Sequence, residues 1–150
     1  MSLVPTSVSV ISCRKESSIY GCTISSLVSV DVQEDSPEIV FVLKKQSLVG
    51  EKIRANNCFT ISVLSVGQDE VAHKYSTERS PENILDSNWI VDGDFAELLN
   101  SRITMNCKLL KIYDNHAAEI FVGQVVKYFG DHSKSSLIYD ARRYGRFQSN

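Results

Sequence analysis

The sequence predicts a mainly β protein in which antiparallel strands form a closed or partly closed barrel, with two or three short helices inserted. Six or seven segments are rich in β-branched residues or alternate between apolar and polar residues. These segments follow one another in runs and do not alternate one-for-one with helices, which disfavours a doubly wound parallel sheet. The chain of 150 residues is long enough for one domain with a proper core.

The first three predicted strands lie near the N-terminus. Residues 7–12 alternate with a period of two, and residues 20–29 are β-prone. The polar residues 14–18 between them predict a hairpin turn. Residues 39–43 (IVFVL) form a continuous apolar run, which is typical of a strand that is buried on both faces.

A short helix and a fourth strand follow. Val49 and Ile53 lie four residues apart, so they would share one face of a helix that opens near Ser47 and runs to residue 56. Residues 59–64 alternate between apolar and polar side chains and predict a strand.

The middle of the chain carries two helix-start signals. Residues 65–68 (SVGQ) have the form of a capping box, and the helix that they open would run to about Tyr75. Ser80, followed by proline, predicts a second and brief helix. Residues 89–93 are expected to form a loop or an edge strand.

The C-terminal part predicts a long hairpin and a last strand. Residues 103–109 and 120–129 are its two arms, and Asn115 and His116 lie in the turn. Gly123 marks a bulge or a close approach within the second arm. Residues 137–139 form the last short strand.

The composition disfavours several classes of protein. The formal net charge is −2 and there is no basic block, which argues against nucleic acid or an anionic membrane surface as a partner. The longest apolar run is too short to span a bilayer, and the N-terminus lacks a signal pattern. The four cysteines are dispersed, and their spacing with the three histidines does not support a metal site. We therefore expect a reduced, cytoplasmic protein.

Residues 20–29 (YGCTISSLVS) differ from an ordinary buried strand. They carry glycine, cysteine, one threonine and three serines where such a strand would carry large apolar side chains. Small residues in strands often mark a place where another molecule approaches the backbone. We interpret this stretch as the wall of a ligand site. The alternative for Ser25 and Ser26 is a solvent-facing position on an edge strand.

Five segments, in order along the chain, resemble the motifs of a known family. Residues 5–10 (PTSVSV) resemble P-T-G-V-x-V, and residues 20–27 (YGCTISSL) resemble Y-G-M-T-x-S-S-F. Residues 59–64 (FTISVL) and 120–125 (IFVGQV) resemble F-x-V-N-V-L and I-F-x-G-x-V, and residues 137–147 resemble L-L-Y followed by R-x-Y-G-x-L. The chain is thus similar, nearly end to end, to flavin reductase-like proteins with the FMN-binding split-barrel fold. These include the reductase components of two-component flavin monooxygenases.

The resemblance implies a fold, a cofactor and an activity. It implies one flavin reductase-like, FMN-binding split β-barrel domain over residues 1–150, and a homodimer with FMN or FAD at the subunit interface. It also implies NAD(P)H-dependent reduction of the flavin, in which the nicotinamide passes hydride to N5. The reduced flavin would be supplied to a partner, such as a flavin-dependent monooxygenase.

The resemblance also suggests which residues bind the flavin. The backbone and hydroxyls of residues 23–26 would supply hydrogen-bond donors to the edge of the ring. Residues 44–47 place two lysines and a hydroxyl at a helix start, where an anionic phosphate is well held; the alternative is a solvated charged turn. The predicted cofactor-binding residues are Cys22, Thr23, Ile24, Ser25, Ser26, Lys44, Lys45, Gln46, Ser47, Arg142 and Tyr144.

The roles of the C-terminal residues stay open. Arg142 and Arg143 would reach the site from the dimer partner or meet a nucleotide phosphate, or else form a solvated tail. Tyr144 would cover a ring or simply pack against its neighbours.

Two departures from the family motifs bear on nicotinamide use. The family usually has G-D-H before the I-F-x-G strand, and its histidine position is occupied here by Ala118. His116 is the candidate catalytic residue, as a displaced substitute. The literal triplet at residues 130–132 follows the strand and matches by chance. Ser7 stands where the family often has glycine, and it could narrow the space over the flavin.

Two other functions remain open. Ala118 favours an FMN-binding electron-transfer flavoprotein that does not turn over NAD(P)H, whereas residues 142–147 favour the reductase. The third alternative is a split-barrel protein that has lost its cofactor and serves as a binding module.

Overall fold

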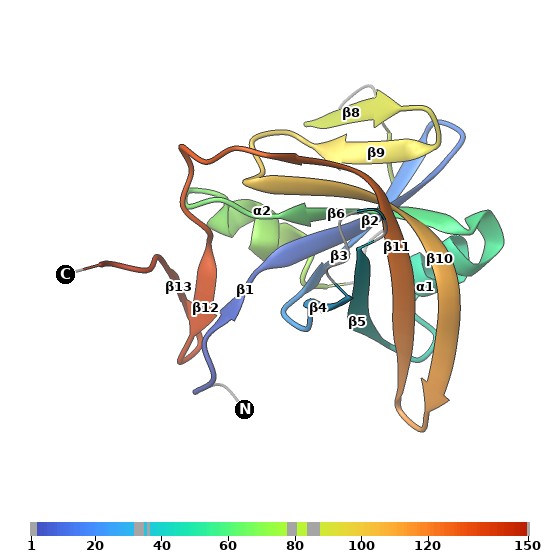
Figure 1. Ribbon diagram of the computed structural model, residues 1–150, viewed down its shortest axis with the longest axis horizontal. Coiled ribbons are helices and arrows are strands. Elements are labelled where there is room, and N and C mark those ends of the chain that lie inside the picture. Colours follow the sequence, from blue (N-terminus) through green and yellow to red (C-terminus); the bar gives the residue numbers. More distant parts are fainter. Residues whose placement is uncertain (1–2, 32–34, 36, 78–80, 84–87, 150) are drawn as a thin grey trace.

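The computed structural model describes residues 3–31, 35, 37–77, 81–83 and 88–149, which form an antiparallel β structure with two helices (Figure 1). The main component is a sheet of eight strands, in which every neighbouring pair of strands is antiparallel. In sheet order the strands are β4 (Val28–Asp31), β5 (Glu38–Lys44), β11 (Ala118–Gly130), β10 (Ile103–Asn115), β6 (Cys58–Val63), β2 (Ser9–Lys15), β3 (Ser18–Ile24) and β7 (Glu82–Asn83). The long β10–β11 hairpin curves along the length of the molecule (Figure 1).

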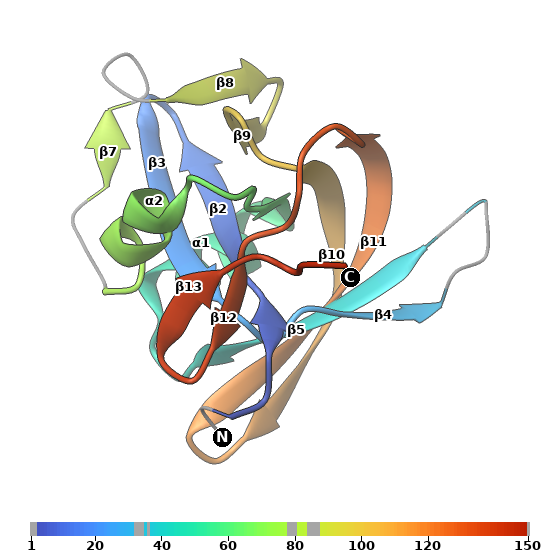
Figure 2. The ribbon, with the colours of Figure 1, turned by 90° about the vertical axis from the view of Figure 1, so that its left-hand side faces the viewer.

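Two smaller sheets complete the fold. The first joins the two ends of the chain, because β1 pairs with β12 and β12 pairs with β13 (Figure 2). The second is the β8–β9 hairpin, which is fastened to the main sheet by the Ser12 hydroxyl, a donor to the Ala96 carbonyl at 2.8 Å. Their strands are β1 (Thr6–Ser7), β12 (Ile138–Asp140), β13 (Arg143–Gly145), β8 (Trp89–Asp92) and β9 (Phe95–Leu98).

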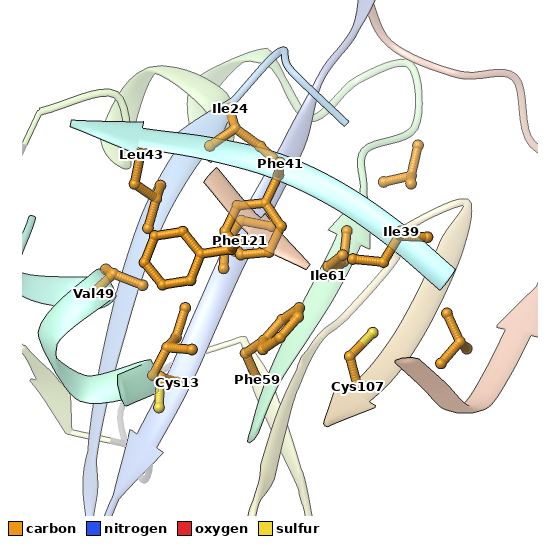
Figure 3. Close-up of a cluster of buried hydrophobic side chains, with 14 residues drawn as sticks. Cys13, Ile24, Ile39, Phe41, Leu43, Val49, Phe59, Ile61, Cys107 and Phe121 are labelled. Carbon is orange, nitrogen blue, oxygen red and sulfur yellow. The ribbon is translucent and has the colours of Figure 1, made fainter. Parts of the chain in front are cut away.

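Three phenylalanines form the centre of the largest core cluster (Figure 3). Phe41 stacks on Phe121 with ring centroids 5.2 Å apart, and it meets Phe59 edge-on at 5.1 Å. A Cβ at Gly123 would clash with the Phe59 ring, so the predicted close approach at this glycine is confirmed. A register shift lies directly opposite Gly123, between Leu109 and Lys111 on β10.

The predicted helix after the third strand is confirmed as α1 (Leu48–Asn56). Ser47 is its N-cap, and the Ser47 hydroxyl accepts the Gly50 N–H at 3.3 Å. Val49 and Ile53 are both buried in the core cluster, as their four-residue spacing predicted. The helix therefore begins at the turn that follows β5.

Residues 20–29 do not form one strand. Strand β3 ends at Ile24, and the chain starts β4 at Val28, on the opposite edge of the sheet. The intervening Ser26 hydroxyl accepts the Val42 N–H at 3.0 Å and thereby links the end of β3 to β5. This contact joins residues 16 positions apart, so the local pattern of residues 20–29 does not reveal it.

The apolar run at residues 39–43 forms β5, but the prediction of burial on both faces is wrong. Ile39, Phe41 and Leu43 are buried, whereas Val42 is 37% exposed. The strand thus has one face on the core and one face toward solvent, as is common in antiparallel sheets.

The second predicted helix starts later than its capping signal suggested. It is α2 (Asp69–Lys74). Gln68 does reach back to accept the Ser65 N–H at 2.9 Å, but the Ser65 hydroxyl donates to the Asn100 carbonyl at 2.8 Å instead of capping the helix. The predicted brief helix at Ser80 is not borne out at residues 81–83, where Pro81 is not helical and Glu82–Asn83 form β7; Ser80 and residues 84–87 lie outside the described residues. Of the loop and the edge strand that were both open for residues 89–93, the structure has a strand, β8.

The described residues contain no helix that is both long and apolar enough to cross a membrane. They also contain no group of three or more histidines, cysteines, aspartates or glutamates arranged to hold a metal ion. Burial raises the pKa of the Cys107 thiol to about 12, as expected for a thiol that packs in the core.

Candidate functional site

A pocket of about 740 Å³ lies where the ends of β3 and β5 meet. Residues 22–26 form one wall and residues 42–47 the facing wall. Ser76 and Thr77, which follow α2, and Ala118, the first residue of β11, complete the lining. The pocket thus gathers four segments that are far apart in the sequence.

The wall at the end of β3 is held in place by Thr23. The Thr23 hydroxyl donates to the Ala72 carbonyl at 2.7 Å, and the Thr23 N–H donates to the Tyr75 carbonyl at 2.8 Å. Both polar groups are therefore used to join β3 to α2. The neighbouring Ser25 side chain is exposed, and no hydrogen bond to its hydroxyl occurs within the described part of the chain.

Tyr75 supports this wall from behind. Its ring lies so close to Gly21 that a Cβ there would be 2.8 Å from Tyr75 Cδ1. The Tyr75 hydroxyl donates to a Glu82 carboxylate oxygen at 2.6 Å, and the Trp89 indole N–H donates to the Tyr75 oxygen at 3.2 Å. Burial raises the pKa of Glu82, but hydrogen bonds from Lys74, Tyr75 and Trp89 outweigh burial and hold that pKa below its usual 4.5.

The facing wall is the turn from β5 into α1. The Ser47 N–H donates to the Lys44 carbonyl at 3.2 Å, and Gln46 has a φ of 63°, in the left-handed region. This tight turn places the buried Ser47 and the N-terminus of α1 at the pocket. The N-terminus of a helix carries unsatisfied N–H groups and a partial positive charge, so this wall favours an anion.

Two lysines add charge to the same wall. Lys44 and Lys45 both line the pocket and are exposed. The Lys45 N–H donates to the Ala117 carbonyl at 3.1 Å, and Lys45 Nζ lies 2.8 Å from Asp114 Oδ1. Strand pairing sets Lys44 opposite Ala118, which brings the β10–β11 hairpin to the pocket.

A family model described as "Flavin reductase like domain" matches residues 1–148. The chain belongs to this family. The family predicted from the five motifs is therefore confirmed.

Several flavin reductases are similar to this chain in sequence or in fold. An NADH-dependent FAD reductase of Streptomyces globisporus is 24% identical over 133 residues, which is 85% of this chain and 71% of that protein. The solved NADH:FAD oxidoreductase SgcE6 of Streptomyces globisporus C-1027 is 20% identical with a TM-score of 0.89, over 99% of this chain and 89% of that chain. The styrene monooxygenase flavin reductase of Pseudomonas putida S12 is 19% identical with a TM-score of 0.85, over 99% of this chain and 95% of that chain. The two solved structures confirm the predicted split-barrel fold.

Nine of the eleven predicted cofactor-binding residues of this flavin reductase-like chain line the one pocket. They are Cys22, Thr23, Ile24, Ser25, Ser26, Lys44, Lys45, Gln46 and Ser47. Residues 22–26 and residues 44–47 lie about twenty positions apart in the sequence. They face each other because the chain crosses between β3 and β4.

The remaining candidates lie elsewhere in the protomer. His116 is exposed in the β10–β11 turn with a φ of 43°, and it does not line the pocket, although Ala118 does. Arg142 is in the β12–β13 turn with a φ of 66°. Tyr144 lies against Tyr139, with ring centroids 5.3 Å apart, and lines a separate pocket beside α2.

Two further pocket residues, Ser76 and Thr77, were not predicted from the sequence. They follow the predicted helix directly and both carry hydroxyls, which is the only local signal that they offer. Their place in the pocket depends on the contact between Tyr75 and β3, which joins residues about fifty positions apart.

Proposed function

We propose that this protein is an NAD(P)H:flavin oxidoreductase that reduces FMN or FAD and supplies the reduced flavin to a partner enzyme. The observation that carries the proposal is the single pocket lined by residues 22–26 and 44–47. Support also comes from the relatives, because the Streptomyces globisporus oxidoreductase has been solved in complex with NAD and FAD fragments. The relative from Pseudomonas putida S12 is the flavin reductase of a styrene monooxygenase, and a monooxygenase of this kind is the class of partner that we propose.

The residues of the pocket fit a flavin mononucleotide. Lys44, Lys45 and the N-terminus of α1 provide positive potential for a phosphate. Ser25 lines the other wall and is exposed there, so its hydroxyl can bind the polar edge of the ring system. We propose FMN as the preferred flavin, since one phosphate satisfies the positive wall.

When bound, the flavin supplies the redox chemistry by accepting hydride from the nicotinamide at N5. The protein's own residues position the two molecules and exclude water from between them. No side chain of the pocket has to donate or accept a proton in the hydride transfer itself. Ala118 in place of a histidine is therefore compatible with turnover.

We propose a homodimer in which the outer face of the sheet is covered. Val28, Val40 and Val122 are aligned across three strands on that face, and Val28 is 59% exposed. A partly exposed apolar row on a sheet face is typical of an interface. In such a dimer Arg142 and Tyr144 of a second copy would approach the flavin.

We also propose that the protein works in the cytoplasm. All four cysteines are present as thiols, which a reducing compartment maintains. The whole chain would then act as a single flavin-binding domain in that compartment.

A second candidate function is an electron-transfer flavoprotein that holds FMN without turning over NAD(P)H. The specific observation in its favour is Ala118, which lines the pocket at the position of the family histidine. The two functions differ in one measurable property, the response of the bound flavin to NADH.

An absorbance spectrum before and after anaerobic addition of NADH tests the proposal. The purified protein reconstituted with FMN should be yellow and should bleach within seconds. A yellow protein that NADH does not bleach, but that dithionite reduces, would favour the carrier. A protein that neither binds nor reduces added FMN or FAD would refute both functions.

A further inference from the structure

A carboxylate outside the pocket lining, that of Asp114, pairs with one of the two lysines of the proposed phosphate wall. Asp114 Oδ1 lies 2.8 Å from Lys45 Nζ, within salt-bridge distance. Asp114 belongs to the end of β10, and the backbone contact between Lys45 and Ala117 fastens the lysine beside that hairpin. The side chains of Lys45 and Asp114 are 42% and 68% exposed, so solvent and ligands reach both.

We propose that Asp114 is a specificity-determining residue that competes with the flavin phosphate for Lys45 and thereby keeps the flavin exchangeable. This inference rests on the proposed function of the pocket. A phosphate that approaches Lys45 meets an ammonium that already has an anionic partner, and it is also repelled by the Asp114 charge. Riboflavin has no phosphate and does not meet this competition.

The competition suits an enzyme that hands its flavin to another protein. Release of the flavin leaves a positive group in the wall, and the Asp114 carboxylate is in place to pair with it. Lys45 therefore has an anionic partner in both states, the phosphate when flavin is bound and Asp114 when it is not. The free energy of flavin binding is then smaller than it would be with an unpaired lysine. Exchange of flavin is faster than it would be with an unpaired lysine, because most affinity differences appear in the dissociation rate.

The chain offers a matched control carboxylate one strand away. Glu119 is the strand partner of Asp114 in the β10–β11 register. It forms an ion pair with Arg54 of α1, and neither Glu119 nor Arg54 lines the pocket. Glu119→Gln removes the same charge from the same hairpin without touching the phosphate wall.

Equilibrium titrations with FMN and with riboflavin test the inference. We expect Asp114→Asn to bind FMN about three- to tenfold more tightly than the wild type, with riboflavin affinity unchanged. The gain should shrink between about 50 mM and about 500 mM NaCl, because salt screens exposed charges. In steady state, the KM for FMN should fall in Asp114→Asn without a rise in kcat.

Two comparisons decide the outcome. Glu119→Gln should leave the ratio of FMN to riboflavin affinity unchanged, and Asp114→Asn should have a clearly smaller effect when Lys45 is replaced by methionine, because only the direct repulsion then remains. An equal gain for FMN and riboflavin, an equal gain in Glu119→Gln, or a gain of full size in the Lys45→Met background would each overturn the role of Asp114. If the wild type binds neither flavin, the proposed function fails as well. If the wild type binds FMN but Asp114→Asn has the same ratio of FMN to riboflavin affinity as the wild type, only this inference fails.

Discussion

Replacing Gly21 by alanine tests how the rear of the proposed flavin pocket is held. A Cβ at Gly21 would lie 2.8 Å from Tyr75 Cδ1 and 3.0 Å from Cε1, which is closer than the 3.4–4 Å of ordinary van der Waals contact. The Tyr75 ring cannot retreat freely, because it is buried and hydrogen-bonded through its hydroxyl to Glu82 and Trp89. The new methyl group must therefore move either the ring or strand β3.

The size of the effect follows from two opposing contributions. Overpacking of this kind destabilises a core by about 1–3 kcal/mol. Alanine returns about 0.4–1 kcal/mol by restricting the unfolded chain. We expect a net loss of about 1–2 kcal/mol in the free energy of unfolding, or roughly 2–8 °C in Tm for a chain of this length.

Urea unfolding of the Gly21→Ala variant, followed by tryptophan fluorescence, measures the loss. Trp89 is the only tryptophan of the chain, and its indole N–H is bonded to the Tyr75 oxygen, so the signal reports on the site itself. Gly130→Ala is the control, since a Cβ at Gly130 meets nothing within 4 Å. FMN affinity should also fall by about tenfold, equivalent to 1.4 kcal/mol, because the Tyr75 carbonyl anchors the pocket wall. Equal urea midpoints and equal FMN affinities for the two variants would refute the reasoning.

Three further predictions concern Ala118, Glu82 and Cys107. Ala118→His should raise kcat/KM for NADH roughly tenfold, which corresponds to one added contact of about 1.4 kcal/mol. The Kd of FMN, measured by fluorescence, should stay unchanged. The pKa of Glu82 is held below its usual 4.5, so its contribution to stability is present above that pH and is lost as the pH falls below it. The urea midpoint should therefore drop in this acidic range, and Glu82→Gln should flatten the drop, with Trp89 emission changing over the same range. Because burial raises the pKa of Cys107 to about 12, mass spectrometry should find Cys107 unmodified after iodoacetamide treatment of the folded protein near pH 8 and modified after unfolding.

The segments whose structure depends on local pattern were predicted from the sequence. The β2–β3 hairpin follows from alternation on either side of a polar turn, and α1 follows from a serine cap and a four-residue apolar spacing. Gly123 signalled a close approach because a strand glycine has no side chain to pack. Each of these signals lies within a few residues of the feature that it specifies.

The features that were missed depend on long-range contacts. Strand β3 ends at Ile24 and Ser26 then bonds to Val42, and nothing in residues 20–29 reports that partner. The same is true of Ser65, whose hydroxyl bonds to the Asn100 carbonyl and does not cap a helix. The hydrogen-bond partners of side-chain hydroxyls are especially hard to predict, because each hydroxyl can bond to a helix end, a turn or a distant carbonyl with similar energy.

The same contacts change how the serine- and threonine-rich wall should be understood. From the sequence, the hydroxyls of residues 23–26 are candidate donors to the flavin ring. In the structure, the Thr23 hydroxyl is bonded to the Ala72 carbonyl and the Ser26 hydroxyl to the Val42 backbone, so both hold the wall together. Ser25 is exposed at the pocket and has its hydroxyl available to a ligand. The Thr23 and Ser26 hydroxyls therefore shape the pocket wall, whereas the Ser25 hydroxyl is available to a ligand. Substitutions at Thr23 should lower stability, and substitutions at Ser25 should lower flavin affinity alone.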